Sequence, residues 1–77
     1  MRQVAILTQR AESLTDVLFS LEEPWRSRFL DLVAIQATGE SWTWSGEPPS
    51  EEKVTHWLGN QNLYENVNRM LHTWQRM

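Results

Sequence analysis

The side chains best suited to acid–base or metal chemistry in this chain are two histidines, His56 and His72. A catalytic zinc site ordinarily needs three protein ligands, and helical pairs of them follow H-x-x-x-H or H-E-x-x-H spacing. Neither spacing occurs in the sequence. Glu52 lies four residues before His56, and such a pair on a helix contributes only about 0.2–0.5 kcal/mol. We therefore expect no metal site and a structural or solvated role for both histidines.

Motifs for nucleophilic catalysis and phosphate binding are also missing from the sequence. Serines are present without a G-x-S-x-G turn, and the three glycines are isolated, so no glycine-rich phosphate loop is formed. Cysteine is absent, which removes thiol catalysis, disulfides and cysteine-bound zinc. The acidic pairs at 22–23 and 51–52 fall at expected helix boundaries, where helix capping accounts for them. We predict that the protein is not an enzyme and uses no cofactor.

Length and composition indicate one small domain, residues 1–77. A domain of this size buries only about 60% of the surface of its unfolded chain, so its core is thin. Without disulfides or a structural metal, such domains depend on good helix packing or on association. We therefore expect a homodimer.

Charge and hydropathy narrow the range of partners and locations. The net charge is −3 with a pI near 5.2, and no segment forms a basic stripe, which disfavours nucleic acid as a partner. No apolar run exceeds the four residues 32–35, which is too short to span a membrane. The apolar segment among the first residues is too short for a signal peptide. We expect a cytoplasmic protein.

Helical spacing of apolar residues predicts an all-α fold, a compact four-helix arrangement of two helical hairpins. The expected helices are about 3–22, 24–38, 51–58 and 62–76, with an irregular, Trp-containing connection at 39–49. The first helix has an apolar stripe wider than one neighbouring helix can cover, which suggests contact with a second copy of the chain. We expect that dimer interface to consist of Val4, Leu7, Ala11, Leu14 and Leu18.

Helix boundaries follow from individual residues. Pro24 suits the first turn of the second helix, and Gly39 suits a left-handed cap at its end. Ser50 is expected to cap the third helix, which is too short for a full bundle member and is expected to cover one end. Asn62 and Glu65 resemble a capping box for the fourth helix. The second helix has the widest apolar arc, so we expect it to be the most buried.

Tryptophan is unusually abundant, with five copies in 77 residues. Trp25, Trp57 and Trp74 lie on apolar helix faces and are expected in the core. Trp42 and Trp44 lie in the connection, and in an extended segment side chains two apart share a face. Both are therefore expected either to fold back over the groove between the second and fourth helices or to contact a partner protein.

The function that fits these patterns is a non-enzymatic protein–protein interaction module, such as a regulator, adaptor or assembly factor. The residues expected to bind the partner are Trp42, Trp44, Phe19 and Ile6. The alternative is a small DNA-binding regulator that uses a helix-turn-helix-like segment at 51–76. In that case carboxamides at 60–62 and Asn66 would read bases, although Glu65 would then face the DNA.

Overall fold

Four α-helices and one 3₁₀ turn form most of residues 2–75, the part of the chain that the computed structural model describes. Side chains are described for residues 9–74. The elements are α1 (Arg2–Ser20), α2 (Trp25–Thr38), η1 (Trp42–Trp44), α3 (Glu51–Leu58) and α4 (Gln61–Gln75). The predicted all-α fold is confirmed, and the predicted helix boundaries are correct to within about two residues. Within residues 2–75, no helix combines the length and the apolar character needed to cross a bilayer.

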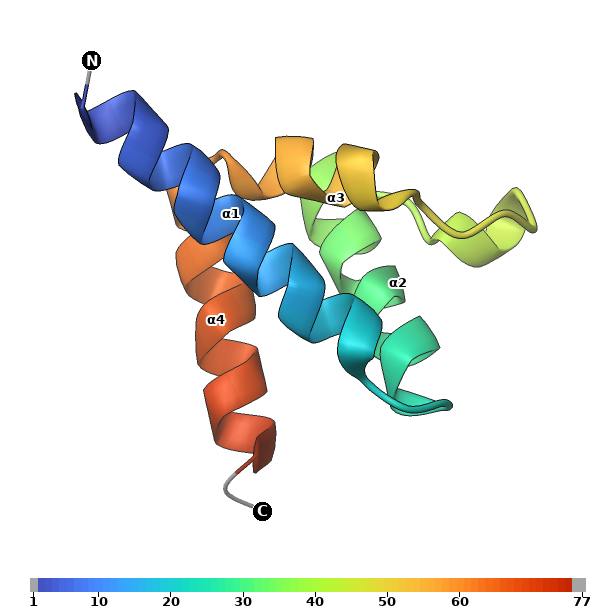
Figure 1. The fold of residues 1–77 in the computed structure, drawn as a ribbon. Helices are drawn as coiled ribbons and strands as arrows, with labels where there is room; N and C mark the ends of the chain where they lie inside the picture. The colour runs from blue at the N-terminus through green and yellow to red at the C-terminus, as the bar shows by residue number, and fades with distance from the viewer. Residues whose placement is uncertain (1, 76–77) are drawn as a thin grey trace.

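The helices are arranged around α1, which runs obliquely across the other three (Figure 1). Its most extensive contacts are with α3, and it touches α2 and α4 less. The short third helix, predicted to cover one end, therefore also contributes to the core. Val54 and Leu58 of α3 are fully buried, because this short helix inserts its apolar face into the core.

All four helices contribute to the hydrophobic core. Its fully or almost fully buried members are Ala11, Leu14, Leu18, Phe29, Leu30, Val33, Val54, Leu58, Leu63, Val67 and Leu71. The three α1 residues in this set had been assigned to a dimer interface. They are at most 5% exposed in a single chain, so the helices of the same chain already cover them. The side chains of Val4 and Leu7, the other two predicted interface residues, lie outside the described part.

One buried polar contact joins α1 to α3. Thr15 is 2% exposed, and its hydroxyl donates to the carbonyl oxygen of Ala11 at 2.8 Å. The hydroxyl oxygen of Thr15 in turn accepts a hydrogen bond from the hydroxyl of Thr55, also at 2.8 Å. The Thr15 hydroxyl is thus fully paired, which avoids the cost of burying an unsatisfied polar group.

Local signals at the helix ends are mostly confirmed. Gly39 adopts the left-handed conformation (φ 84°), and its N–H donates to the carbonyl oxygen of Ile35 at 2.8 Å. Ser50 caps α3 by accepting from the N–H of Lys53 at 3.2 Å. The predicted capping box of α4 is wrong. Asn60 performs the capping instead, because its side-chain oxygen accepts from the N–H of Leu63 at 3.2 Å.

The start of α2 is capped from one residue further out than usual. Pro24 occupies the capping position and makes no side-chain hydrogen bond there. The carboxylate of Glu23 accepts from the N–H of Ser27 at 2.8 Å and from its hydroxyl at 2.6 Å. The bonds from Ser27 stabilise the charged carboxylate and lower the pKa of Glu23 below its ordinary value of 4.5.

Candidate interaction site

The connection between α2 and α3, predicted to be irregular, contains a 3₁₀ turn at Trp42–Trp44 and is not extended there. In a helix of three residues per turn, side chains two apart point in different directions, so Trp42 and Trp44 diverge. Trp42 is half-buried against the molecule, whereas Trp44 is 78% exposed. The expectation that both rings share one side and cover the core is therefore wrong for Trp44.

Hydrogen bonds fix the beginning of this turn and attach it to α2. The hydroxyl of Ser41 accepts from the N–H of Thr43 at 3.2 Å and lies 2.6 Å from the Thr43 hydroxyl. It also contacts the carboxylate of Asp31, on α2, in a short hydrogen bond. Ser41 therefore links the turn to a helix ten residues earlier in the chain.

The end of the turn is fixed as well. The hydroxyl of Ser45 donates to the carbonyl oxygen of Trp42 at 2.8 Å. Gly46 follows in the left-handed conformation with φ 76°, which allows the chain to reverse direction. Trp44 lies between these two fixed ends, so its exposure belongs to an ordered backbone.

A pocket lies beside this turn, between the end of α2, the connection and the start of α3. Its chemistry comes from three indole rings, two glutamates, one lysine and two consecutive prolines. These residues are Trp42, Trp44, Trp57, Glu40, Glu47, Lys53, Pro48 and Pro49. We refer to this site as the connection pocket. It combines aromatic surface with negative charge.

The polar groups of the connection pocket are incompletely paired. The ammonium of Lys53 lies 6.0 Å from the ring centre of Trp57, within range of a cation–π interaction. In the described residues, one salt bridge is formed, between Arg26 and Glu23, so neither pocket glutamate has one. Among the described residues, the buried indole N–H of Trp42 has no acceptor. Buried donors are rarely left unpaired, so this N–H makes the pocket a candidate site for a ligand that supplies an acceptor.

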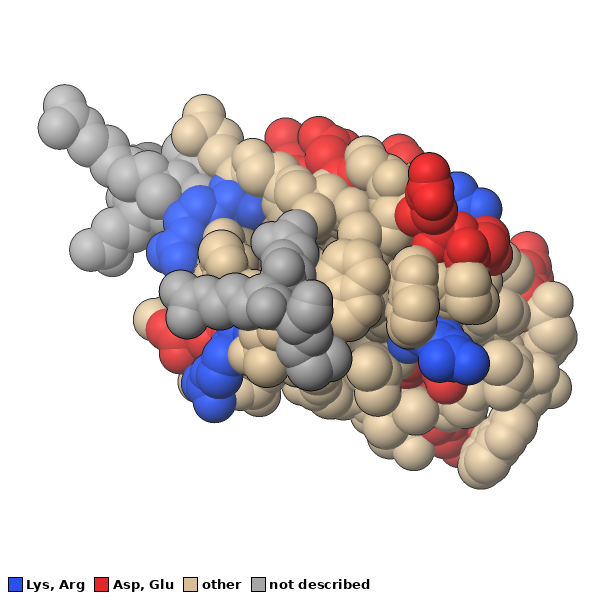
Figure 2. Space-filling view, turned by 90° about the horizontal axis from the view of Figure 1, so that it is seen from below, with Lys and Arg blue, Asp and Glu red and all other residues tan. Residues whose placement is uncertain are grey.

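A second surface, formed by α2 and α4, is apolar. A groove between the two helices is lined by Phe29, Leu32, Met70 and Trp74, together with Arg69 and Thr73. The rings of Phe29 and Trp74 pack edge to face, with centres 5.4 Å apart. In Figure 2, acidic side chains gather along the upper edge of the view, and both acidic and basic side chains also interrupt the uncharged surface below it.

The same surface corrects the prediction for Trp25. It is 41% exposed and packs on Trp74 with ring centres 5.7 Å apart, so it is not a core residue. Helix α2 buries Phe29, Leu30, Val33 and Ala34, whereas Leu32 and Ile35 are 42% and 41% exposed. Its apolar arc is wider than the neighbouring helices can cover. Trp57 and Trp74 are partly buried and pack against the core, as expected.

The other two predicted partner-binding residues do not join the connection pocket. Phe19 is partly buried and packs against the core, so the interpretation of Phe19 as an exposed contact is wrong. The side chain of Ile6 lies outside the described part of the chain. Of the four residues, Trp42 and Trp44 are therefore the two that the structure brings together at one site.

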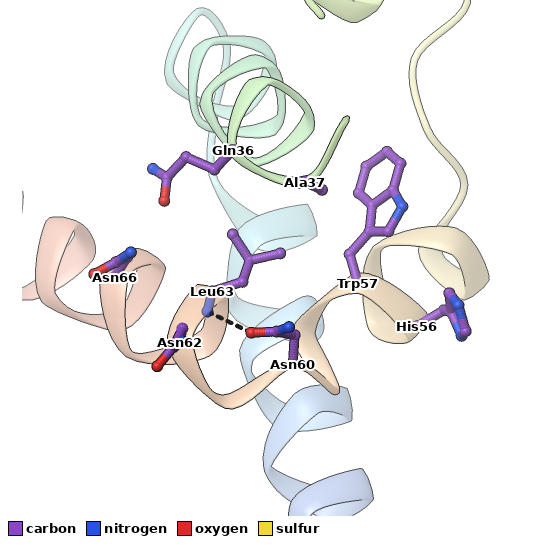
Figure 3. A pocket seen from close by; sticks show the side chains of 8 residues that line it. All are labelled: Gln36, Ala37, His56, Trp57, Asn60, Asn62, Leu63 and Asn66. Atoms are coloured by element: carbon purple, nitrogen blue, oxygen red, sulfur yellow. Dashed lines mark hydrogen bonds between the residues drawn. The ribbon is translucent and has the colours of Figure 1, made fainter. Parts of the chain in front are cut away.

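A third pocket lies where α2, α3 and the start of α4 meet (Figure 3). It is lined by Gln36, Ala37, His56, Trp57, Asn60, Asn62, Leu63 and Asn66. The carboxamides of Asn60, Asn62 and Asn66 belong to the segment that was considered above for reading DNA bases. The side chain of Asn60 is engaged in capping α4, and that of Gln61 donates to Glu65 at 3.3 Å. Across the described residues, no three His, Asp or Glu side chains lie close enough to hold a metal ion.

No family model, curated protein or solved structure matches this chain. Its function must therefore be inferred from the residues themselves.

Proposed function

We propose that this protein is a non-enzymatic protein-interaction module whose main contact residue is Trp44. The observation that carries the proposal is the 78% exposure of this ring on a turn fixed at both ends. A large apolar side chain left in water forgoes roughly 2–3 kcal/mol of burial, which a partner would recover. Tryptophan is also enriched among the residues that dominate binding energy at protein interfaces.

The order of the turn adds to this argument. Association is weakened when flexible side chains and loops must be immobilised at the interface. The bonds of Ser41 and Ser45 hold the backbone on both sides of Trp44 before any partner arrives. A partner would therefore bind an ordered turn at a lower cost in conformational entropy.

Homodimerisation forms a second part of the proposal, with an interface different from the one expected from sequence. The exposed Leu32 lines the groove formed with Met70 and Trp74, and the exposed Ile35 lies one turn further along α2. Burying this apolar face against its equivalent in a second copy would add to the thin core of a 77-residue chain. Such a dimer would leave Trp44 free for another protein.

Binding of duplex DNA is the weaker proposal. Helix α4 carries only Arg69 among its described residues as a permanent cation, and Glu65 lies one turn before it. Phosphate neutralisation supplies most of the affinity of non-specific DNA binding, and this chain offers little of it. Micromolar binding to random duplex DNA at physiological salt in a gel shift would reverse the order of the two proposals.

Site-specific photo-crosslinking tests the proposed function. Benzoylphenylalanine replaces Trp44 in one variant and Glu12, which is exposed on α1, in a control variant. Both are expressed in cells of the source organism and irradiated. We expect a discrete crosslinked protein at position 44 and not at position 12, and loss of its binding to purified Trp44→Ala. Equal crosslinking at both positions, or none at position 44, would contradict the proposal.

A further inference from the structure

We propose that the connection pocket binds an arginine-containing, positively charged segment of a partner protein. This inference rests on the proposed function, because it specifies the chemistry of the partner that Trp44 contacts. It follows from three features that the described residues give the pocket: an indole face without a cation, carboxylates without salt bridges, and a buried N–H without an acceptor.

The aromatic part of the pocket is suited to a cation. Guanidinium groups stack on indole faces, and tryptophan is the strongest of the aromatic residues in such interactions. The ammonium of Lys53 already lies over Trp57 in this pocket. The other cations described in such contacts lie over Tyr64 and Trp25, so the face of Trp44 is left without one. A guanidinium supplied by a partner would find this face exposed.

The charge of the pocket favours a positive ligand. Residues 39–58 contain four glutamates and a single basic residue, Lys53. Of the four, Glu40 and Glu47 line the pocket, and within the described part of the chain their carboxylates form neither salt bridges nor hydrogen bonds. An arginine can pair with a carboxylate through two parallel hydrogen bonds, a geometry that lysine cannot reproduce. The pocket therefore presents acceptors in addition to an aromatic face.

The indole N–H of Trp42 indicates that the ligand is a peptide segment and not an isolated cation. This donor is buried and unpaired, which is unfavourable, and a cation offers it no acceptor. A main-chain carbonyl group would supply the acceptor after a small shift of the ring. Pro48, which is exposed, lines the same pocket and offers apolar surface to the methylene stem of an arginine.

Calorimetric titration with three short peptides tests this inference. All have blocked ends and a glycine–serine background. The first carries two arginines, the second carries citrulline at the same positions, and the third carries prolines. Citrulline keeps the shape of arginine and removes its charge. We expect the arginine peptide to bind at least about tenfold more tightly than the citrulline peptide. Its affinity should decrease several-fold in about 0.5 M salt.

Two variants connect this binding to the pocket. Trp44→Ala and the double variant Glu40→Gln/Glu47→Gln should each lower the affinity for the arginine peptide about tenfold. The matched control is Glu12→Gln/Asp16→Asn, which removes two exposed acidic charges from α1 and should leave the affinity unchanged. Because every substituted side chain is exposed, the variants are expected to keep the circular dichroism spectrum of the wild type.

Each other outcome overturns the inference. Equal affinity for the arginine and citrulline peptides, or binding of neither, would show that the pocket does not select positive charge. Tighter binding of the proline peptide would indicate a groove for polyproline segments. An equal loss of affinity for the arginine peptide in the α1 control variant would indicate a non-specific effect of net charge. In all of these cases, specific crosslinking at position 44 would still support the proposed interaction function, so the two failures can be told apart.

Discussion

At the residue scale, Trp42 and Trp44 show how two identical side chains acquire different roles from their position in one turn. The Trp42 ring is half-buried with a fully covered N–H, while the Trp44 ring is largely in solvent. We predict that Trp42→Ala lowers the free energy of unfolding by about 1–3 kcal/mol, less than for a fully buried ring. Trp44→Ala should change it by less than about 0.5 kcal/mol.

Urea denaturation followed by circular dichroism measures both changes without relying on tryptophan emission. The two substitutions remove the same atoms, so each serves as the control for the other. Equal destabilisation by both would mean that Trp44 is covered in solution, and it would remove the main support for its role as a contact residue.

Glu23 provides a prediction for the dependence of stability on pH. Its pKa is lowered in the folded protein by the two hydrogen bonds from Ser27. A lowered pKa means that the stabilisation is present above the unfolded value of 4.5 and is lost as the pH falls through the folded value. We predict that Glu23→Gln melts at a lower temperature than the wild type at pH 7 and at nearly the same temperature at pH 2.

Thermal melts of the wild type, Glu23→Gln and Glu22→Gln at the two pH values test this cap. Glu22 is the adjacent glutamate and is also exposed. Its replacement removes the same charge without removing the bonds to Ser27. Two results would show that the carboxylate cap is not the cause. One is a decrease in the melting temperature of Glu23→Gln that is equally large at pH 2. The other is the same decrease for Glu22→Gln at pH 7.

Residue-scale prediction from sequence succeeded where the cause is local. Gly39 and Ser50 were assigned to caps correctly, because their roles depend on backbone conformation and on groups at most four residues away. The turn at Trp42 could not be predicted in the same way. It depends on Ser41 contacting Asp31, ten residues earlier, and the sequence carries no signal for that pairing.

At the element scale, α1 shows what an apolar stripe does and does not specify. The spacing of Leu14 and Leu18 identified the buried face correctly. It did not identify the helix that covers this face, and the stripe was assigned to a second chain. The short helix α3 covers it instead, and Thr15 within the same face pairs with Thr55. The sequence analysis did not single out Thr15, although a threonine within an apolar helix face indicates a polar partner on the helix that covers it.

Adjacent residues of α1 allow a matched test of this packing. Leu18 is completely buried, whereas Val17 is 41% exposed. We predict that Leu18→Ala lowers the free energy of unfolding by about 2–5 kcal/mol, because it leaves a cavity in the core. Val17→Ala should lower it by less than about 1 kcal/mol. A small effect of Leu18→Ala in urea denaturation would contradict the described packing of α1.

At the scale of the whole molecule, the chain presents two surfaces of different chemistry. The connection pocket combines indole rings with carboxylates, and the face of α2 and α4 is almost wholly apolar. The face of α2 and α4 could not be located from sequence, because it combines segments that are distant in the chain. The connection pocket lies within residues 34–57, and Trp42 and Trp44 were predicted as partner contacts, but the different directions of their rings could not be predicted. The abundance of tryptophan and the wide apolar arc of α2 indicated only that such surfaces should exist.

The apolar face leads to a prediction for the oligomeric state. Stable interfaces bury on the order of 1,200–2,000 Å², and their centres are more apolar than the surrounding surface. We expect the wild type to sediment at tens of micromolar with about twice the 9.1 kDa mass of one chain. Leu32→Glu should shift the protein to the monomer, because it places a charge at the proposed interface.

The control is Val17→Glu, which introduces the same charge at a residue of nearly identical exposure on α1. It should leave the sedimentation of the wild type unchanged, since α1 lies outside the proposed interface. A monomeric wild type would contradict the homodimer altogether. Dissociation of the dimer by Val17→Glu but not by Leu32→Glu would show that the interface lies on α1. The face of α2 and α4 would then be free to bind a different protein.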